Sequence, residues 1–243
     1  MISVFGGTAA YHLDLSKFAI VGETVELDTP FGKSVPFTYL KPPGEKKESV
    51  WFASRHGRGS LSRSACFVNQ HANVWAAREL GCAAILSWNG VGAIHPDLQV
   101  NDLVVPDDLL DFTHSRKTEF RMRNSGRMMD MPRELVRLPF SEEYRQVLIE
   151  SAQISIRQSA IYVCTEGPRL ETPAEIRAYR QLGADVVGMT LSPEVWLAAE
   201  LGLGYASLCY VTNTAAGLGG TERNFGPQVG EKCLEIMLQT ALL

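Results

Sequence analysis

Short apolar runs alternate with segments of helical periodicity along most of the 243-residue chain. The runs are rich in branched residues and are bounded by glycine, proline or polar residues, which is typical of strands. Predicted strands span residues 2–5, 50–53, 83–88, 103–105, 161–164, 185–189 and 205–211. Predicted helices span residues 69–80, 141–155, 172–182, 193–201 and 230–242. This alternation predicts an α/β fold with helices flanking a central mixed, mainly parallel sheet.

The composition favours a single folded domain over residues 1–243. Hydrophobic residues make up 45% of the chain and charged residues 21%, which suits one compact core. The net charge is -4 and the isoelectric point is about 5.8, whereas nucleic-acid-binding proteins usually carry a basic excess or stripe. The one dense basic run, residues 116–127, is interrupted by other residues and is typical of an exposed loop. We therefore expect no nucleic-acid partner.

The five cysteines are odd in number and widely spaced, and no two form a Cys-x-x-Cys pair. This pattern predicts neither a disulfide framework nor a zinc site, and reduced thiols are typical of cytoplasmic proteins. The N-terminal residues lack the features of a signal peptide, and no apolar stretch reaches the length that spans a membrane. We expect a cytoplasmic protein with no metal site and no membrane partner.

Two connections between predicted elements are distinctive. Residues 41–48 read Lys-Pro-Pro-Gly-Glu-Lys-Lys-Glu, which predicts an exposed hairpin connection. Residues 114–138 form a long predicted loop, and such loops are uncommon in a compact domain unless they have a function. We therefore expect the second connection to contribute to function.

Candidate chemistry follows the predicted strands, because ligands of α/β folds gather at the carboxyl ends of strands. Gly6-Gly7-Thr8 can hold an anion through backbone N–H groups and a hydroxyl, although an ordinary turn uses the same residues. Arg55-His56 suits an oxyanion, because a guanidinium can clamp two oxygens; an exposed polar turn is the alternative. The small residues of the 89–93 stretch let a ligand approach the backbone, or they allow a close contact between a helix and a strand.

Three further polar residues stand at strand ends or helix starts, namely Glu171, Thr190 and Asn213. Each has a simple structural explanation on its own. Glu171 can favour the dipole of the following helix, and Asn213 can form a turn. Those explanations are harder to hold for all of the polar positions together, which favours one shared site.

These segments together resemble the family of trimeric purine nucleoside phosphorylases and 5′-methylthioadenosine phosphorylases. The most specific part is Glu-Gly-Pro-Arg-x-Glu-Thr at 166–172, then a helix, then Gly-Ala-Asp-Val-Val-Gly-Met-Thr-x-x-Pro-Glu at 183–194. The order and spacing of the stretches at 6–8, 28–33, 55–57, 69–75 and 89–94 agree, so the resemblance covers nearly the whole chain. It implies a purine nucleoside phosphorylase-like fold and one nucleoside phosphorylase domain over residues 1–243, closest to the methylthioinosine and methylthioadenosine branch.

The resemblance also implies roles for individual residues. The residues implied to bind phosphate are Thr8, Arg55, His56 and Thr190, helped by the backbone at Gly90. The ribose is implied to lie on Met189, and the base to lie against Leu170, Glu171, Gly188 and Asn213. Catalytic roles are implied for Asn213, Glu171 and His56. Phosphorolysis builds positive charge on the sugar and negative charge on the purine, so a phosphate and purine-side donors suit it. No cofactor or metal is implied, because inorganic phosphate is a co-substrate.

Two positions bear on the choice of base. Methylthioadenosine phosphorylases of the family carry Thr-Asp-x-Asp where this chain has Asn213 and Ala215, and tend to carry serine where it has Glu171. An ionised glutamate accepts a hydrogen bond from N1–H of a 6-oxopurine, while N1 of adenine offers only a lone pair. A buried mismatch of this kind costs a few kcal/mol. The sequence therefore favours hypoxanthine or guanine as the base.

The sugar end of the substrate is less sharply defined. The 28–33 and 54–58 stretches resemble the methylthio-nucleoside branch, and a subgroup that cleaves 5′-methylthioinosine also pairs an asparagine with a following Ala-Ala-Gly. The loop at 59–67 departs from the family pattern, since it is about one residue longer and lacks the usual histidine and proline. We expect a 5′-methylthio nucleoside, with methylthioadenosine as the other member of that class.

Three alternatives stay open at this point. One is a general 6-oxopurine nucleoside phosphorylase acting on inosine and guanosine, and another is a nucleoside hydrolase that uses water. The third is a nucleoside-binding protein without turnover. The expected partners are the nucleoside and phosphate, and the resemblance implies a homotrimer in which His114 or the 114–130 loop reaches a neighbouring site.

Overall fold

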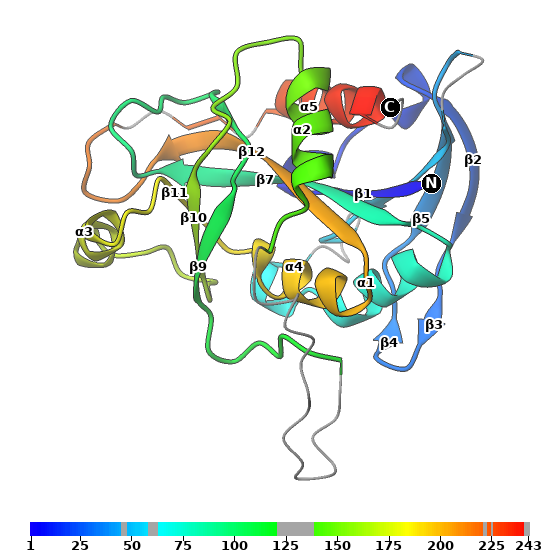
Figure 1. The fold of residues 1–243 in the computed structure, drawn as a ribbon, viewed down its shortest axis with the longest axis horizontal. Helices are drawn as coiled ribbons and strands as arrows, with labels where there is room; N and C mark the ends of the chain where they lie inside the picture. Colours follow the sequence, from blue (N-terminus) through cyan, green and yellow to red (C-terminus); the bar gives the residue numbers. More distant parts are fainter. Residues whose placement is uncertain (45–47, 58–62, 121–138, 221–222, 225, 241–243) are drawn as a thin grey trace, which may run out of the picture.

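One ten-stranded sheet runs through the molecule and carries a large share of its buried side chains (Figure 1). The computed structural model describes residues 1–44, 48–57, 63–120, 139–220, 223–224 and 226–240. The strands are β1 (Ile2–Gly6), β2 (Ile20–Val25), β3 (Asp28–Thr29), β4 (Gly32–Lys33), β5 (Phe37–Lys41), β6 (Val50–Ser54), β7 (Ala84–Ala93), β8 (Leu103–Val104), β9 (Asp108–Phe112), β10 (Ile161–Thr165), β11 (Val186–Gly188) and β12 (Gly204–Thr214). The helices are α1 (Gln70–Glu79), α2 (Glu142–Ser151), α3 (Pro173–Gln181), α4 (Leu191–Glu200) and α5 (Pro227–Thr240).

The sheet is mixed and mainly parallel, which confirms the predicted fold class. Its order is β2-β5-β6-β1-β7-β11-β10-β9, and β12 and β8 extend from β7. Strands β1, β6, β7 and β12 run parallel to one another. Strands β9, β10 and β11 form a second parallel group, and β11 lies antiparallel to β7. The two groups therefore run toward each other, and their carboxyl ends converge over the second half of β7.

Helices cover both faces of this sheet (Figure 1). Helices α1 and α4 pack against each other below it in the figure, and α2 and α5 pack together above it. Two buried apolar clusters result, one under each pair of helices. A third, smaller cluster fixes α3 against β10 and β11 through Ile176 and Tyr179. A capping box between Thr172 and Glu175 starts α3 and so fixes the position of the preceding residue, Glu171.

The central strand β7 is longer than the sequence predicted. The apolar run ends at residue 88, and the following Asn-Gly-Val-Gly-Ala was expected to leave the strand. In the structure β7 continues to Ala93, because β12 pairs with it along its full length and β11 pairs with its final residues. Tertiary pairing overrides the weak strand propensity of Gly90 and Gly92 here.

Several strands were not predicted from the hydrophobic pattern. Strand β2 lies at the edge of the sheet and is mostly exposed, so its sequence carries no apolar run. Strand β9 forms the opposite edge and is partly exposed, and its two aspartates interrupt the apolar run. The connection at 41–48 joins the antiparallel neighbours β5 and β6 as expected, while its residues 45–47 lie outside the described residues. Most of the predicted 114–138 loop, from residue 121 onward, lies outside them as well.

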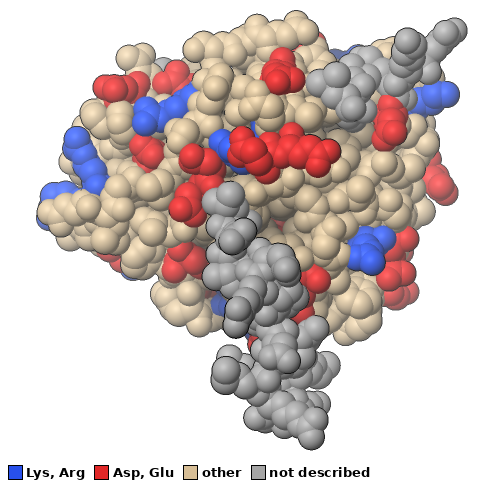
Figure 2. Space-filling view, viewed as in Figure 1, with Lys and Arg blue, Asp and Glu red and all other residues tan. Residues whose placement is uncertain are grey.

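Charge on the surface follows the acidic composition. Asp and Glu side chains gather across the middle of the face in Figure 2, and Lys and Arg side chains lie scattered around them. None of the helices in the described part of the chain has the length and apolarity needed to cross a membrane.

Candidate functional site

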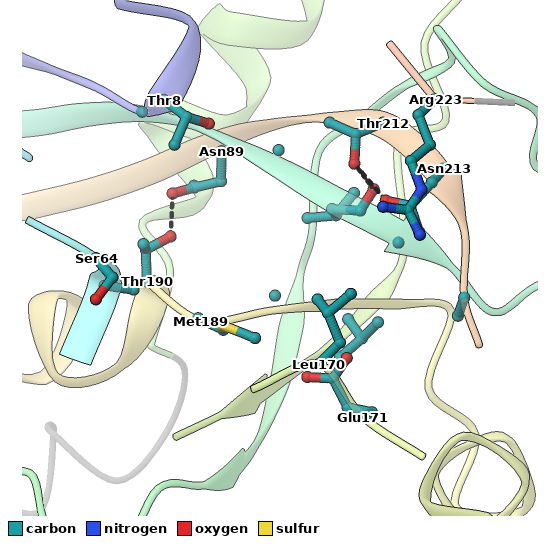
Figure 3. A pocket seen from close by; sticks show the side chains of 18 of the residues that line it. Thr8, Ser64, Asn89, Leu170, Glu171, Met189, Thr190, Thr212, Asn213 and Arg223 are labelled. Atoms are coloured by element: carbon teal, nitrogen blue, oxygen red, sulfur yellow. Dashed lines mark hydrogen bonds between the residues drawn. The ribbon is translucent and has the colours of Figure 1, made fainter. Parts of the chain in front are cut away.

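A cavity of about 320 Å³ opens where the two groups of parallel strands converge (Figure 3). Its walls come from the ends of β1 and β6, the second half of β7, the end of β12, and the segments that follow β10 and β11. Thr8, Asn89 and Thr190 lie at one end of the cavity, and Leu170, Glu171, Asn213 and Arg223 lie at the other. All the predicted site residues line it, namely Thr8, Arg55, His56, Gly90, Leu170, Glu171, Gly188, Met189, Thr190 and Asn213.

Arg55 is the most deeply buried charged residue of this cavity. Its Nε and Nη2 donate to the two carboxylate oxygens of Glu194, at 2.9 and 2.8 Å. Its Nη1 donates to the Trp88 carbonyl oxygen at 3.0 Å and to Asn89 Oδ1 at 2.6 Å. The guanidinium therefore holds Asn89 in place while its own charge is balanced by Glu194. A direct contact between Arg55 and phosphate stays a prediction.

Asn89 connects Arg55 to Thr190. Its Oδ1 accepts hydrogen bonds from the Arg55 guanidinium and from the Thr190 hydroxyl. Its amide nitrogen donates to Ser207 Oγ at 2.5 Å. The sequence predicted a role only for the backbone of this stretch and not for the Asn89 side chain, whose neighbours come from three distant segments.

His56 is buried and electrically neutral at pH 7. Burial, helped by the nearby Arg55 cation, lowers the pKa of His56 to about 4. Its Nδ1 lies 2.8 Å from the Arg63 carbonyl oxygen, and a carbonyl only accepts, so Nδ1 carries the hydrogen. The second ring nitrogen, Nε2, is then left with a lone pair. His56 can therefore accept a hydrogen bond through that nitrogen.

The opposite end of the cavity is built around a carboxylate and an amide. Glu171 accepts a hydrogen bond from Thr165 Oγ1 at 2.6 Å. The Asn213 amide nitrogen donates to the Thr214 carbonyl at 2.8 Å, and Asn213 Oδ1 accepts from the Thr212 hydroxyl at 2.7 Å. A register shift in β12 between Val211 and Asn213 accompanies this arrangement. One amide hydrogen of Asn213 stays free to bind a ligand.

The floor between the two ends is formed by the segment after β11. A Cβ atom at Gly188 would lie 2.0 Å from the Tyr162 hydroxyl oxygen, so only glycine fits there. That same hydroxyl accepts from the Thr190 backbone N–H at 3.4 Å. The Met189 carbonyl is held by the Arg116 guanidinium. Gly188 thus allows the close packing that positions Met189 and Thr190.

Leu170 is 64% exposed although it lines the cavity. An apolar side chain so placed gains from packing against a flat ligand, because apolar area leaves water. Ser64 and Ala65 line the cavity as well, whereas residues 59–62 of the 59–67 loop lie outside the described residues.

His114 does not line this cavity. Its backbone N–H donates to the Glu166 carboxylate at 2.9 Å, as does that of Ser115 at 3.2 Å. These bonds and the Arg116 cation lower the pKa of Glu166 to about 2 against the opposing effect of burial. The predicted reach of His114 into a neighbouring subunit stays a prediction. Among the described residues no group of three or more His, Cys, Asp and Glu side chains could hold a metal ion.

Sequence comparison identifies a family for nearly the whole chain. A family model described as "Phosphorylase superfamily" matches residues 13–241. A protein named "Probable S-methyl-5′-thioinosine phosphorylase" from Methanothermobacter thermautotrophicus is 39% identical over 90% of this chain and 73% of its own. A "6-oxopurine nucleoside phosphorylase" from Pyrococcus furiosus is 40% identical over 85% of this chain and 82% of its own. An "S-methyl-5′-thioadenosine phosphorylase" from Nitrosopumilus maritimus is 37% identical over 87% of this chain and 78% of its own.

Structure comparison agrees with the sequence comparison. Methylthioadenosine phosphorylase from Schistosoma mansoni in complex with tubercidin has a TM-score of 0.84 and 28% identity, and the match covers 99% of this chain and 89% of that one. The same enzyme in complex with adenine has a TM-score of 0.85 and 27% identity, and the match covers 99% of this chain and 90% of that one. The fold around the cavity is thus that of structures that bind purines or purine nucleosides.

Proposed function

The chain belongs to the phosphorylase superfamily, and we propose that it cleaves a 5′-methylthio purine nucleoside with inorganic phosphate. Enzymes of this kind are pentosyltransferases: they release the free purine and leave the sugar as a 1-phosphate. The observation that carries the proposal is a cavity that has hydroxyl and amide groups at one end and the Glu171–Asn213 pair at the other. We treat residues 1–243 as one nucleoside phosphorylase domain.

Phosphate is proposed to bind at the end formed by Thr8, Asn89 and Thr190. The Thr190 hydroxyl donates to Asn89 Oδ1, so the donors left for phosphate are the Thr8 hydroxyl and the backbone N–H near Gly90, and the neutral His56 adds an acceptor. An acceptor suits hydrogenphosphate, which carries one hydroxyl group. Arg55 is proposed to bind the phosphate. Its guanidinium also holds Asn89, whose Oδ1 accepts a hydrogen bond from the Thr190 hydroxyl. A water-dependent nucleoside hydrolase has no need for this set, which favours the phosphorylase over the hydrolase.

The reaction balances with hydrogenphosphate as the second substrate. A phosphate oxygen forms a bond to C1′ of the sugar while the bond between C1′ and N9 breaks. The bonding electron pair leaves with the purine, and the proton that hydrogenphosphate loses is the one that the purine gains. The protein stabilises the negative charge on the departing purine and aligns the phosphate below the sugar. The sugar is proposed to lie on Met189. Asn213, Glu171 and His56 are the residues proposed to carry these catalytic contacts.

The base is proposed to be a 6-oxopurine. Glu171 lies at the base end as an acceptor, which suits the N1–H of hypoxanthine or guanine, and the free amide hydrogen of Asn213 suits N7. Leu170 is proposed to stack on the base, with Gly188 beneath its edge. Relatives named for methylthioinosine and for 6-oxopurine nucleosides support this choice. A general 6-oxopurine nucleoside phosphorylase, acting on inosine and guanosine, is the second candidate, because a relative with that name is 40% identical to this chain.

A panel of four nucleosides tests the choice of substrate. Initial rates with methylthioinosine, methylthioadenosine, inosine and adenosine at fixed phosphate give kcat/KM for each. We expect methylthioinosine to be the best substrate; a higher value for inosine would favour the general enzyme. A protein that binds these nucleosides without cleaving any of them would be a binding protein instead.

Replacement of Asn213 tests the assignment of the base end. Asn213→Asp puts a carboxylate where the 6-amino group of adenine can donate to it, and it places negative charge beside the 6-oxo group. We expect the ratio of kcat/KM for methylthioadenosine to that for methylthioinosine to rise at least about tenfold. The exposed Gln181→Glu variant, which adds the same charge outside the cavity, should leave the ratio unchanged. An unchanged ratio for Asn213→Asp would remove Asn213 from the base site.

Assembly and compartment are proposed on more general grounds. The sequence resemblance to trimeric enzymes supports a homotrimer, which sedimentation equilibrium of the purified protein measures directly. The five cysteines are free thiols in the structure, and reduced thiols support a cytoplasmic location. The proposed partners are the nucleoside and phosphate, with no prosthetic group.

A further inference from the structure

Arg223 lies at the base end of the cavity and was not singled out by the sequence. It lines the cavity together with Asn213, and it also lines an adjoining hollow of about 410 Å³ bounded by the 213–220 turn. In Figure 3 its guanidinium lies beside the Asn213 amide, over the part of the cavity that faces Leu170 and Glu171. Within the described part of the chain its guanidinium makes no hydrogen bond or ion pair. Its charge is therefore available to a ligand.

The backbone of Arg223 is fixed even though its side chain is exposed. Arg223 pairs with Asn213 through an isolated antiparallel bridge. The next residue, Asn224, donates its backbone N–H to the Thr212 carbonyl at 2.8 Å, and its side chain donates to Asn101. The origin of the Arg223 side chain is thus held opposite Asn213, at the end of β12. This placement is part of the fold rather than a chance position of a surface side chain.

The charges around the cavity leave a role for a cation at this end. Arg55 is neutralised by Glu194, and His56 is neutral because its pKa is about 4. Glu171 and Arg223 are then the uncompensated charges among the described residues that line the cavity. The Glu171 carboxylate alone would oppose the negative charge that builds up on the departing purine. A guanidinium at the same end offsets that repulsion.

We propose that Arg223 binds the 6-oxo group of the purine and selects 6-oxopurines over 6-aminopurines. With Asn213 at N7, the 6-oxo oxygen lies on the same edge of the base, on the side where Arg223 stands. The guanidinium donates to this oxygen, which gains negative charge as the bond between C1′ and N9 breaks and the electron pair passes to the purine. The 6-amino group of adenine presents hydrogens at that position, so two donors would face each other. The inference rests on the proposed function and assigns its base specificity.

Substitution of Arg223 tests this assignment with little risk to the fold, because the side chain is exposed. Arg223→Ala removes the cation, Arg223→Gln keeps a neutral donor, and Arg177→Gln on the exposed face of α3 is the matched control. We expect Arg223→Ala to lower kcat/KM for methylthioinosine about tenfold to a hundredfold and to change that for methylthioadenosine much less. Arg223→Gln should lie between Arg223→Ala and the wild type, and Arg177→Gln should match the wild type.

Two results would overturn the assignment: equal losses for both nucleosides, or no loss for either in a folded Arg223→Ala protein. Calorimetric binding of free hypoxanthine and free adenine, in the presence of phosphate, separates this inference from the proposed function. If the wild type cleaves no nucleoside, the proposed function fails, yet tighter binding of hypoxanthine that Arg223→Ala weakens would still support the role of Arg223. If the wild type is active and Arg223→Ala binds hypoxanthine unchanged, only the role of Arg223 fails.

Discussion

The ion pair between Arg55 and Glu194 shows how one buried residue can serve both stability and the site. Both side chains are almost fully buried, and their contact is bidentate. Tyr205 donates to the same carboxylate at 2.6 Å and links it to Ser87. Such a pair is costly to break, because removal of one partner leaves the other charge buried and unpaired.

Arg55→Ala should therefore have two measurable effects. The free energy of unfolding should fall by about 3–5 kcal/mol, because Glu194 loses its partner. The KM for phosphate should rise, because Asn89 and Thr190 lose the support of the guanidinium. Urea unfolding measures the first effect and initial rates over a range of phosphate concentrations measure the second. A folded variant with an unchanged KM for phosphate would remove Arg55 from the phosphate site, and Arg78→Ala serves as a surface control.

His56 gives a prediction for the pH dependence of stability. Its pKa in the folded protein is about 4, below the ordinary value of about 6.5 for an unfolded chain. Between these two values the unfolded chain binds the proton and the folded protein does not. The stability contribution is thus complete above pH 6.5 and is lost as the pH falls toward 4, by about 3 kcal/mol in total.

Denaturant unfolding of the wild type and of His56→Asn from pH 4 to 8 measures this contribution. Asparagine can keep the donor to the Arg63 carbonyl but cannot be protonated. The difference in the free energy of unfolding between the two proteins should therefore change between pH 6.5 and pH 4. Above pH 6.5 it should stay constant. A constant difference over the whole range would mean that His56 titrates alike in the folded and unfolded states.

At the scale of elements, the segment that joins β11 to α4 sets the geometry of the cavity floor. Gly188 ends β11, and Thr190 stands immediately before α4. The Tyr162 ring from β10 fills the space that a side chain at residue 188 would need. A short strand, a glycine and a tyrosine from the neighbouring strand thus position Met189 and Thr190, and the Thr190 hydroxyl bonds to Asn89.

Gly188→Ala tests this packing. Its Cβ would approach the Tyr162 hydroxyl oxygen to 2.0 Å, so the tyrosine or the backbone must move, at a cost of about 1–3 kcal/mol in stability. We expect kcat/KM to fall as well, because Thr190 shifts with its backbone. The double variant Gly188→Ala/Tyr162→Phe lacks the nearest clashing atom and should recover part of the stability, which thermal unfolding reports. No recovery would show that the clash with the hydroxyl is not the cause.

The elements that were predicted from the sequence are those whose burial is strongest. Strands β1, β6 and β10 are buried apolar runs, and α3 begins at a capping box, so local pattern and tertiary contacts agree. Edge strand β2 and the extension of β7 could not be predicted in this way. Strand β2 is mostly exposed and carries no apolar run, although its partner β5 lies close in the sequence. The extension of β7 pairs with β11 and β12, which come from distant parts of the chain, and nothing in the local sequence specifies those partners.

At the scale of the whole molecule, the site depends on the meeting of two opposed groups of parallel strands. The group with β7 and β12 and the group with β10 and β11 bring their carboxyl ends to one cavity. The family motifs stand at those ends, so the cavity residues could be predicted from the sequence. Asn89 and Arg223 were not, because the role of each depends on neighbours that only the assembled sheet supplies, namely Arg55 and Asn213.

In the proposed reaction phosphate, rather than water, cleaves the nucleoside. The most direct measurement follows methylthioinosine with the purified protein by phosphorus NMR and by hypoxanthine absorbance, with and without inorganic phosphate. We expect hypoxanthine to be released only when phosphate is present, and one equivalent of a sugar 1-phosphate to appear for each equivalent of hypoxanthine. Release of hypoxanthine at the same rate without phosphate, together with free 5-methylthioribose, would contradict it.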